Sequence, residues 1–323
     1  MDNGENIQEF FARMADVVSR RYDLHSDKSL RDVYLLNSGF LDTRSDAGFA
    51  FHNREKILAV LADEKRFERL VDLFIHRSIE FTYASNQFVQ IDSLEESELR
   101  RIYADYLSKI KGILLKSHTE KEISRRLSAL VKDHFLDLRT NLSRFFDPET
   151  SKDVQHNAIL QKVVCSEYSA EMQLEILGMQ LETLVEPVLD LGCGKSGRLV
   201  RHLSQKGIQV TGVDRIVDSF PDLIQGDWLD YPLETGFWGT IVSHMAFTNH
   251  FLFHYLYRHG SIEHYARRYM AILNALRPEG SFYYAPGLPF IETYLPEEKY
   301  LLTQKQIVEN LYACRVIRKA QSE

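Results

Sequence analysis

The stretch Asp190-Leu191-Gly192-Cys193-Gly194 decides the fold of the C-terminal half of this chain. The run Val185–Leu189 precedes it, and a helix-like segment, Arg198–Leu203, follows it. This order predicts a strand, a glycine turn and a helix. A carboxylate ends the strand, and the glycines let the backbone approach a ligand closely because they carry no Cβ. The stretch therefore predicts a ligand site at the end of the first strand of an α/β domain.

Short strands alternate with helical stretches through the rest of this half. Periodicity predicts helices over 198–205 and 262–276. Such alternation implies parallel pairing, because the crossover helices lie over the faces of the sheet. We expect a Rossmann-like sheet with helices on both faces, and ligands beyond the carboxyl ends of its strands. The expected strands are Val185–Leu189, Gln209–Val213, Asp222–Gln225, Thr240–Ser243 and Ser281–Ala285.

The first half of the chain predicts helices only. Ser93 with Glu96, and Thr119 with Glu122, fit the capping box that satisfies free amides at a helix N-terminus. Asp147-Pro148-Glu149 is a turn signal and the best candidate for a linker. Apolar residues recur at helical spacing in Ile7–Val17, Leu58–Leu61, Leu99–Ile110 and Ile123–Phe135.

Acidic side chains follow the first three expected strands of the second half. Asp190 ends the first strand, and Asp214 ends the second, about twenty residues after the glycine turn. A carboxylate at that spacing can accept hydrogen bonds from both hydroxyls of a ribose. The third strand ends at Gly226-Asp227-Trp228, where Asp227 could accept from an adenine amino group and Trp228 could cover the purine. The set predicts a nucleoside site.

Over 185–280 the chain resembles the class I S-adenosylmethionine-dependent methyltransferase superfamily. The resemblance rests on Asp190-Leu191-Gly192-Cys193-Gly194, Gly212-Val213-Asp214, Gly226-Asp227-Trp228 and Leu276-Arg277-Pro278-Glu279-Gly280. It implies that S-adenosylmethionine is the cofactor and that Gly192 and Gly194 form its binding turn. It also implies that Asp190 lies near the amino-acid part of the cofactor, that Asp214 binds the ribose and that Asp227 reads the adenine.

The chain departs from the family pattern at two places. Ser196 stands where the family turn has its third glycine, and Gly197 follows one step later. Phe237-Trp238-Gly239 replaces an acid that often precedes the fourth strand. A segment just upstream of the turn covers the cofactor in many relatives, so Tyr168 is either a cofactor contact or a helix-packing residue.

Two other interpretations compete for the glycine turn. Gly192, Gly194 and Gly197 also fit the dinucleotide pattern of a nicotinamide dehydrogenase. Asp190 argues against it, because the carboxylate would crowd a pyrophosphate of like charge. The ammonium group of a zwitterionic amino-acid tail would instead use that acid. The third possibility is a turn of glycines that binds no ligand.

The region after the fourth strand is rich in histidine and aromatic residues. Histidine titrates near neutrality, so His244, nearest the strand end, is the first candidate for a catalytic base and His250 the second. His250 and His254 also have the spacing of metal ligands on one helix face, but no third ligand is evident, and we expect no metal. The aromatic run 247–257 is a pocket wall or a core helix. Neither an Asn-Pro-Pro-Tyr nor an Asp-Pro-Pro-Tyr motif follows, nor a Pro-Cys pair, which favours an oxygen, nitrogen or sulfur acceptor on a small molecule or peptide.

Composition limits the partners. The formal net charge is −7, so bulk attraction to nucleic acid is excluded, and we expect none to bind. The densest basic stretch, 100–126, alternates with apolar residues and predicts a solvated helix face. The three cysteines have no metal-like spacing and fit a reducing compartment. We expect neither a signal peptide nor a membrane span, and the cytoplasm is the default location.

These patterns together predict an enzyme of two domains. Residues 1–150 form a helical domain that lids the substrate pocket or supports a homodimer, and residues 151–323 form the methyltransferase domain. The predicted reaction moves a methyl group from S-adenosylmethionine to a small molecule. The alternatives are a methyltransferase that acts on RNA or protein, and a non-catalytic binding subunit that keeps the fold.

Overall fold

The computed structural model describes residues 6–26, 28–34, 43–89, 91, 93–142, 168–257, 262–309 and 311–320. The chain divides into two compact units, Met1–Val164 and Cys165–Glu323. The linker candidate Asp147-Pro148-Glu149 lies outside the described residues, as does Cys165. Each unit has a core of its own and is described by itself.

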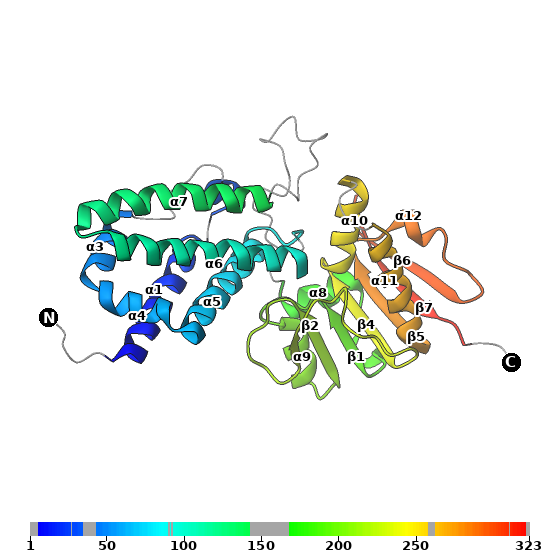
Figure 1. Ribbon diagram of the computed structural model, residues 1–323. Coiled ribbons are helices and arrows are strands. Elements are labelled where there is room, and N and C mark those ends of the chain that lie inside the picture. The colour runs from blue at the N-terminus through cyan, green and yellow to red at the C-terminus, as the bar shows by residue number, and fades with distance from the viewer. Residues whose placement is uncertain are drawn as a thin grey trace. The chain divides into compact units, whose positions relative to one another are not determined.

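The first unit is helical, as predicted (Figure 1). Its longest helices, α5, α6 and α7, pack against one another in sequence order, and α3 packs against α7. Fully buried apolar side chains from different helices form the core, among them Phe10, Leu70, Leu114 and Ile123. The helices are α1 Ile7–Asp23, α2 Leu30–Tyr34, α3 Thr43–His52, α4 Arg54–Ala62, α5 Glu64–Ser85, α6 Ser93–Lys116 and α7 Glu120–Leu142.

Capping explains where two of these helices begin. The Glu122 N–H donates to Thr119 Oγ1 at 3.2 Å, and the Thr119 N–H donates to Glu122 Oε2 at 3.4 Å, so the predicted box before α7 is confirmed. Asn6 and Glu9 form a second box before α1. The start of α6 differs from the prediction, because Ser93 is itself the first helical residue.

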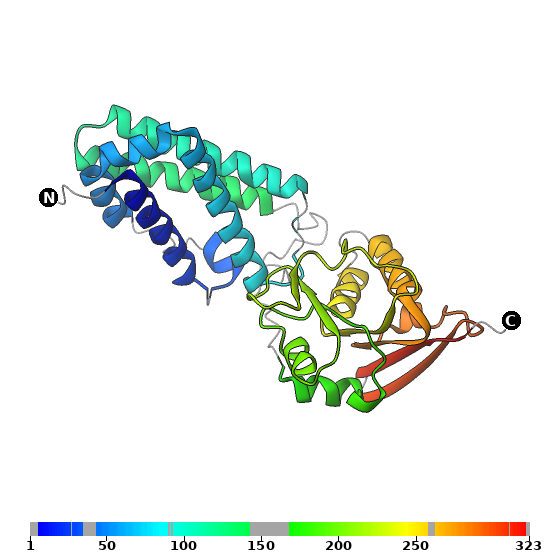
Figure 2. The same cartoon turned by 90° about the horizontal axis from the view of Figure 1, so that it is seen from below.

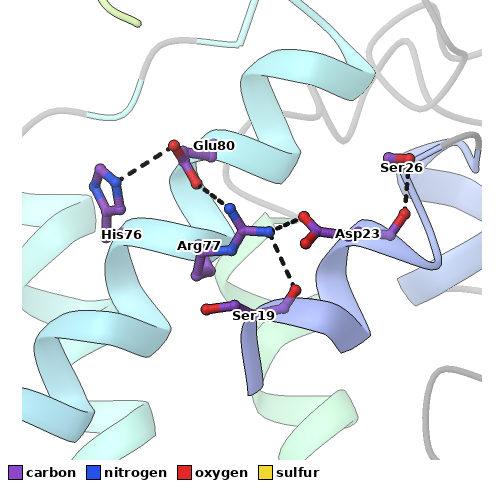
Figure 3. Close-up of polar contacts among 6 residues, drawn as sticks. All are labelled: Ser19, Asp23, Ser26, His76, Arg77 and Glu80. Atoms are coloured by element: carbon purple, nitrogen blue, oxygen red, sulfur yellow. Dashed lines mark hydrogen bonds and ion pairs between the residues drawn. The ribbon is translucent and has the colours of Figure 1, made fainter. Parts of the chain in front are cut away.

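One arginine joins α1 to α5 inside this unit (Figure 3). Arg77 on α5 donates through Nη2 to the Ser19 carbonyl at 3.1 Å and to the Asp23 carboxylate, both on α1. Its Nη1 donates to Glu80 Oε2 at 2.8 Å, and Glu80 also contacts His76 at 3.3 Å. The half-buried guanidinium therefore contributes to the contact between the two helices, together with the hydrogen bond of 3.0 Å between Tyr22 and Ser78.

The second unit is built on a seven-stranded sheet of order β3-β2-β1-β4-β5-β7-β6. Neighbouring strands from β3 to β5 pair in parallel, whereas β7 pairs antiparallel with β5 and with β6. All five predicted strands are present. The β6–β7 hairpin at the edge of the sheet (Figure 2) was not predicted. The strands are β1 Val188–Leu191, β2 Val210–Asp214, β3 Leu223–Gln225, β4 Trp238–His244, β5 Leu276–Ala285, β6 Tyr300–Val308 and β7 Leu311–Arg318.

Helices cover both faces of this sheet, which confirms the predicted α/β class (Figure 1). Side chains alternate along each strand, so Val188 and Val242 pack under α8 and α9 while Leu189 and Ile241 pack under α10 and α11. The elements outside the sheet are α8 Ala170–Leu177, η4 Leu181–Thr183, α9 Arg198–Gln205, α10 Phe247–Tyr257, α11 Ile262–Ala275 and α12 Pro289–Glu292.

The first strand begins three residues later than predicted and extends two residues further. Pro187 has no N–H and cannot donate to a neighbouring strand. Val185, upstream of it, bonds a side chain instead: its N–H donates to Thr240 Oγ1 at 3.2 Å, and that hydroxyl donates to the Val185 carbonyl at 2.8 Å. As a result Asp190 lies inside β1 rather than after it.

Candidate functional site

Three acidic residues lie at or near the ends of three neighbouring strands: Asp190 inside β1, Asp214 as the last residue of β2 and Asp227 after β3. Asp190 in β1 pairs in register with Gly212 of β2, two residues before Asp214. The Gly226 N–H donates to the Asp214 carbonyl at 2.9 Å, which places Asp227 directly beyond it at the end of β3. None of the ion pairs formed within the described ranges involves these three carboxylates.

The glycine turn at the end of β1 requires its glycines. Gly192 and Gly194 have φ values of 81° and 77°, in the left-handed region that other residues rarely adopt. A Cβ on Gly192 would lie 2.2 Å from the Ala246 Cβ, so a side chain cannot fit there. Gly197, the displaced third glycine, has φ 55° and precedes α9 as its N-cap. Although Ser196 stands where the family turn has its third glycine, Gly197 still supplies a glycine at the start of the helix.

Backbone amides orient Asp214. Its Oδ2 accepts from the Gly194 N–H at 2.9 Å, and its Oδ1 accepts from the Ile216 N–H at 3.4 Å. The bond from Gly194 connects the glycine turn to the end of β2, twenty residues later in the chain. Burial raises the pKa of Asp214, although Arg215 and the amides lower it in part. The carboxylate is therefore held in one orientation beside the turn.

Asp190 is buried at high energetic cost. It is 1% exposed, and its Oδ2 has no hydrogen-bond partner. Burial, together with the nearby charge of Asp214, raises the pKa of Asp190 to about 7. A buried carboxylate with one free oxygen is destabilising unless a cation or a donor reaches it. The end of β1 thus holds a buried carboxyl group with an unsatisfied oxygen.

The loop after β3 holds Asp227 and Trp228 in different environments. Asp227 Oδ1 accepts from the Leu229 N–H at 2.8 Å, which stabilises the loop. Trp228 is 3% exposed, and its ring meets the edges of Phe247 at 5.8 Å and His250 at 5.0 Å. Its ring nitrogen would lie 3.8 Å from a Cβ on Gly192, so the indole adjoins the turn. Its contact with a purine, and that of Asp227, stay predictions.

His244 is the last residue of β4, and Tyr168 lies against it. The two rings meet edge to face, with centroids 4.9 Å apart. His244 is 8% exposed, and its Nε2 has no hydrogen-bond partner. Burial lowers the pKa of His244 to about 4, so the imidazole is neutral near pH 7 and can accept a proton or a hydrogen bond. The two residues predicted from separate segments thus lie together.

His250 lies in a different place from His244. It is on α10, 4% exposed, and packed against the edge of Trp228. Burial lowers its pKa well below the ordinary value. His254, one turn later, stacks on Tyr265 with centroids 4.8 Å apart. Among the residues that the structure describes, no three His, Cys, Asp or Glu side chains are arranged to hold a metal ion.

Sequence reasoning missed a residue that joins the strand ends. The Ser243 hydroxyl donates to the Leu191 carbonyl at 2.9 Å and accepts from the Phe247 N–H at 3.0 Å. It therefore links the end of β1, the end of β4 and the start of α10. Ser243 lies inside β4, four residues before α10 begins, so it does not have the position of an N-cap residue and the sequence gives no signal for it.

The predicted basic face of the first unit is paired with carboxylates. Arg100 contacts Glu68 at 3.0 Å and also contacts Asp72, and Lys109 contacts Asp105 at 2.7 Å. These pairs are exposed, as expected for a solvated helix face. No helix in the described part of the chain combines the length and the apolar character needed to cross a bilayer.

Comparison with known proteins gives similarity of structure only. No protein-family profile matches the chain, and no curated protein matches its sequence. The 16S rRNA N2 G1207 methyltransferase RsmC of T. thermophilus, in complex with AdoMet and guanosine, is similar over 46% of this chain and 39% of its own, at 17% identity and a TM-score of 0.30. The glycopeptide N-methyltransferase MtfA, complexed with S-adenosyl-L-homocysteine, is similar over 47% of this chain and 63% of its own, at 18% identity and a TM-score of 0.26.

A third similar structure is a protein of Pyrococcus horikoshii. It matches 46% of this chain and 89% of its own, at 15% identity and a TM-score of 0.33. The chain thus spans less than two thirds of the two methyltransferases and most of the Pyrococcus protein. In all three the match covers less than half of this chain.

Proposed function

We propose that the second unit binds S-adenosylmethionine and transfers its methyl group to an oxygen, nitrogen or sulfur acceptor on a small molecule. The observation that carries the proposal is the unpartnered Oδ2 of Asp190, buried beside Asp214 at the glycine turn. A cofactor with an ammonium group and a ribose supplies a partner for each carboxylate.

The residues at the turn fit this cofactor. The ammonium group would neutralise Asp190, and the ribose hydroxyls would donate to Asp214, whose orientation is already fixed by the Gly194 N–H. Gly192 and Gly194 adopt the left-handed backbone that forms the turn, and a side chain on Gly192 would clash with Ala246. When bound, the cofactor supplies an activated methyl group for an in-line displacement.

A dinucleotide fits the same turn less well. A pyrophosphate carries negative charge, and it would lie near a buried carboxylate that already interacts unfavourably with Asp214. The ammonium group of a zwitterionic tail would itself balance the negative charge of Asp190. A pyrophosphate could bind there only while Asp190 stays protonated. The charge at the end of β1 therefore favours the sulfonium cofactor.

His244 supports a catalytic role for this site. Its neutral imidazole ends the strand next to β1 and can accept a proton from an acceptor hydroxyl or amine. Tyr168 packs against the ring and limits its motion. His250, enclosed beneath Trp228, is the weaker candidate because an acceptor would have to displace core side chains to reach it.

The helical unit has two candidate roles, as a lid over the substrate or as support for a homodimer. A chain lacking residues 1–147 that retained full turnover would contradict both. An RNA or protein acceptor is the alternative within enzymes, and binding of RNA with a strong dependence on salt would favour it. A non-catalytic subunit is the alternative outside enzymes, favoured by cofactor affinity without turnover on any extract.

A calorimetric titration with S-adenosylhomocysteine tests the proposal. We expect Asp214→Ala to weaken binding by about 1–3 kcal/mol, because charged hydrogen bonds to the ribose are lost. Asp218→Ala, four residues further on at an exposed position, is the matched control and should bind like the parent. Absence of binding to the parent chain would refute the proposed function, and an unchanged affinity of Asp214→Ala would refute the assigned ribose site.

A further inference from the structure

An apolar cavity lies within the helical unit, bounded by α1, α3, α4, α5, α6 and α7. Its volume is about 160 Å³, and a second cavity of about 80 Å³ adjoins it. The two share Val17, Phe74 and Tyr106 as walls. Val17 is 40% exposed, so one wall residue also faces solvent beside α1. Close packing normally removes voids of this size from a helical core.

One wall residue has a buried polar atom without a partner. His134 lines the smaller cavity and is 7% exposed, and its Nδ1 forms no hydrogen bond. The imidazole stacks on Tyr106 with centroids 4.1 Å apart and meets Tyr103 at 5.2 Å. A buried nitrogen without a partner is destabilising, so it is unexpected in a space that is only a packing defect.

The cavity attracts neutral rather than charged molecules. Arg21 lines both parts, but the Asp46 carboxylate pairs with its guanidinium through two hydrogen bonds. Burial lowers the pKa of His134 to about 3, so its ring is uncharged at neutral pH. The remaining walls are aliphatic and aromatic, including Phe49, Leu70 and Ile110. Sites for small molecules typically combine such walls with a few convergent polar atoms.

We propose that this cavity binds a neutral aromatic small molecule of one or two rings whose single hydrogen-bonding group meets His134 Nδ1. The size follows from the volume, because an apolar cavity of about 150 Å³ accepts benzene and the adjoining space leaves room for a second ring. The rings pack against Phe74 and Tyr106. The site is independent of the proposed methyl transfer, since every residue named belongs to the first unit.

The test compares naphthalene with 2-naphthol, which differ by one hydroxyl, as probes of the full-length chain. Binding is measured by fluorescence titration. We expect both to bind, and 2-naphthol to bind about tenfold more tightly because its hydroxyl satisfies the buried nitrogen. In His134→Phe the ring shape is kept and the nitrogen removed, so the tenfold preference should disappear while naphthalene binds within about twofold of the parent.

Two further variants make the result decisive. Ile110→Trp and Val131→Phe fill the cavity and should abolish binding of both probes. A thermal unfolding measurement on each variant establishes whether it is folded. His76→Phe, an exposed histidine on α5, is the matched control and should leave both affinities unchanged. The proposal is overturned if neither probe binds the parent chain, if a folded cavity-filling variant binds as well as the parent, or if His134→Phe keeps the preference for 2-naphthol.

Discussion

The buried carboxyl group of Asp190 destabilises the folded chain when it carries its negative charge. The carboxyl of this residue keeps its proton up to a pH of about 7 in the folded chain, against an ordinary value of 3.8. Between these two pH values the folded state binds more protons than the unfolded state. Stability therefore falls as pH rises from about 4 to 7 and levels off above.

This linkage predicts a measurable difference in one variant. Between pH 5 and pH 8 the contribution of Asp190 should cost the apo protein about 2–3 kcal/mol, and Asp190→Asn should remove that loss. Urea unfolding at each pH measures it. Asp218→Asn, at an exposed site, should keep the pH dependence of the parent. A pH dependence that survives in Asp190→Asn would show that another group carries it.

His244 predicts a second pH dependence, in turnover. At saturating cofactor, kcat should stay level from pH 8 to about 5 and fall as the pH approaches 4, because protonation removes the acceptor nitrogen. His244→Ala should lower kcat more than it weakens binding of S-adenosylhomocysteine. Methyl transfer from labelled S-adenosylmethionine to small molecules measures kcat, with His202→Ala on α9 as the control. The opposite pattern, weaker binding with unchanged kcat, would make His244 a structural support.

The residues of the site could be predicted better than their environments. Asp214 and Asp227 follow strands that the apolar pattern reveals, and parallel pairing then brings the strand ends to one edge. The burial of Trp228 could not be predicted, because it depends on how α10 and α11 pack against the loop. The free Oδ2 of Asp190 also depends on which donors surround it in space. The sequence predicts which side chains lie at the site and on which strands, whereas tertiary packing decides how far each side chain is exposed.

At the scale of elements, Arg77 is one of the side chains that join α1 to α5, beside Tyr22, whose hydroxyl hydrogen-bonds Ser78 at 3.0 Å. Arg77 bonds the Ser19 carbonyl, Asp23 and Glu80 at once (Figure 3). Arg77→Met keeps most of the aliphatic stem but leaves those acceptors without their donor. We expect the helical unit to lose about 1–3 kcal/mol in free energy of unfolding, measured by urea denaturation followed by circular dichroism.

A matched arginine isolates the effect of that contact. Among the residues that the structure describes, Arg101 on α6 pairs with Glu98 alone, three residues away on the same exposed surface. Arg101→Met should change stability by no more than about 0.5 kcal/mol, as is usual for exposed ion pairs. Equal effects of the two substitutions would mean that Arg77 contributes charge to a surface and does not hold the two helices in register.

The strands that are buried on both faces were predicted, and the edge hairpin was missed. The strands β1, β2 and β4 are almost wholly buried and read as apolar runs, as parallel strands do. In contrast, most of β6 is exposed, and its Thr303–Gln306 segment carries only polar side chains. The hairpin joins the sheet because β7 pairs with the edge of β5, and β6 then pairs with β7. These pairings cannot be predicted from the local sequence of the two strands.

At the scale of the whole molecule, the two units have separate cores and separate candidate ligands. We expect calorimetry of the full chain to show two unfolding transitions, since each core can melt without the other. S-Adenosylhomocysteine at 100 times its Kd should stabilise only the second unit, by about 2.7 kcal/mol, and should raise its Tm by roughly 5–10 °C. 2-Naphthol should raise only the transition of the helical unit.

The pattern of shifts distinguishes the two roles proposed for the helical unit. A lid closes over the cofactor or substrate, so its stability is linked to theirs, and S-adenosylhomocysteine would raise both transitions. Support for a homodimer links the helical transition to protein concentration instead. A homodimer therefore predicts a helical transition that rises with chain concentration and does not respond to S-adenosylhomocysteine. A joint shift with cofactor, independent of concentration, would assign the helical unit to the lid, because only differential binding to the closed form can couple the two melts.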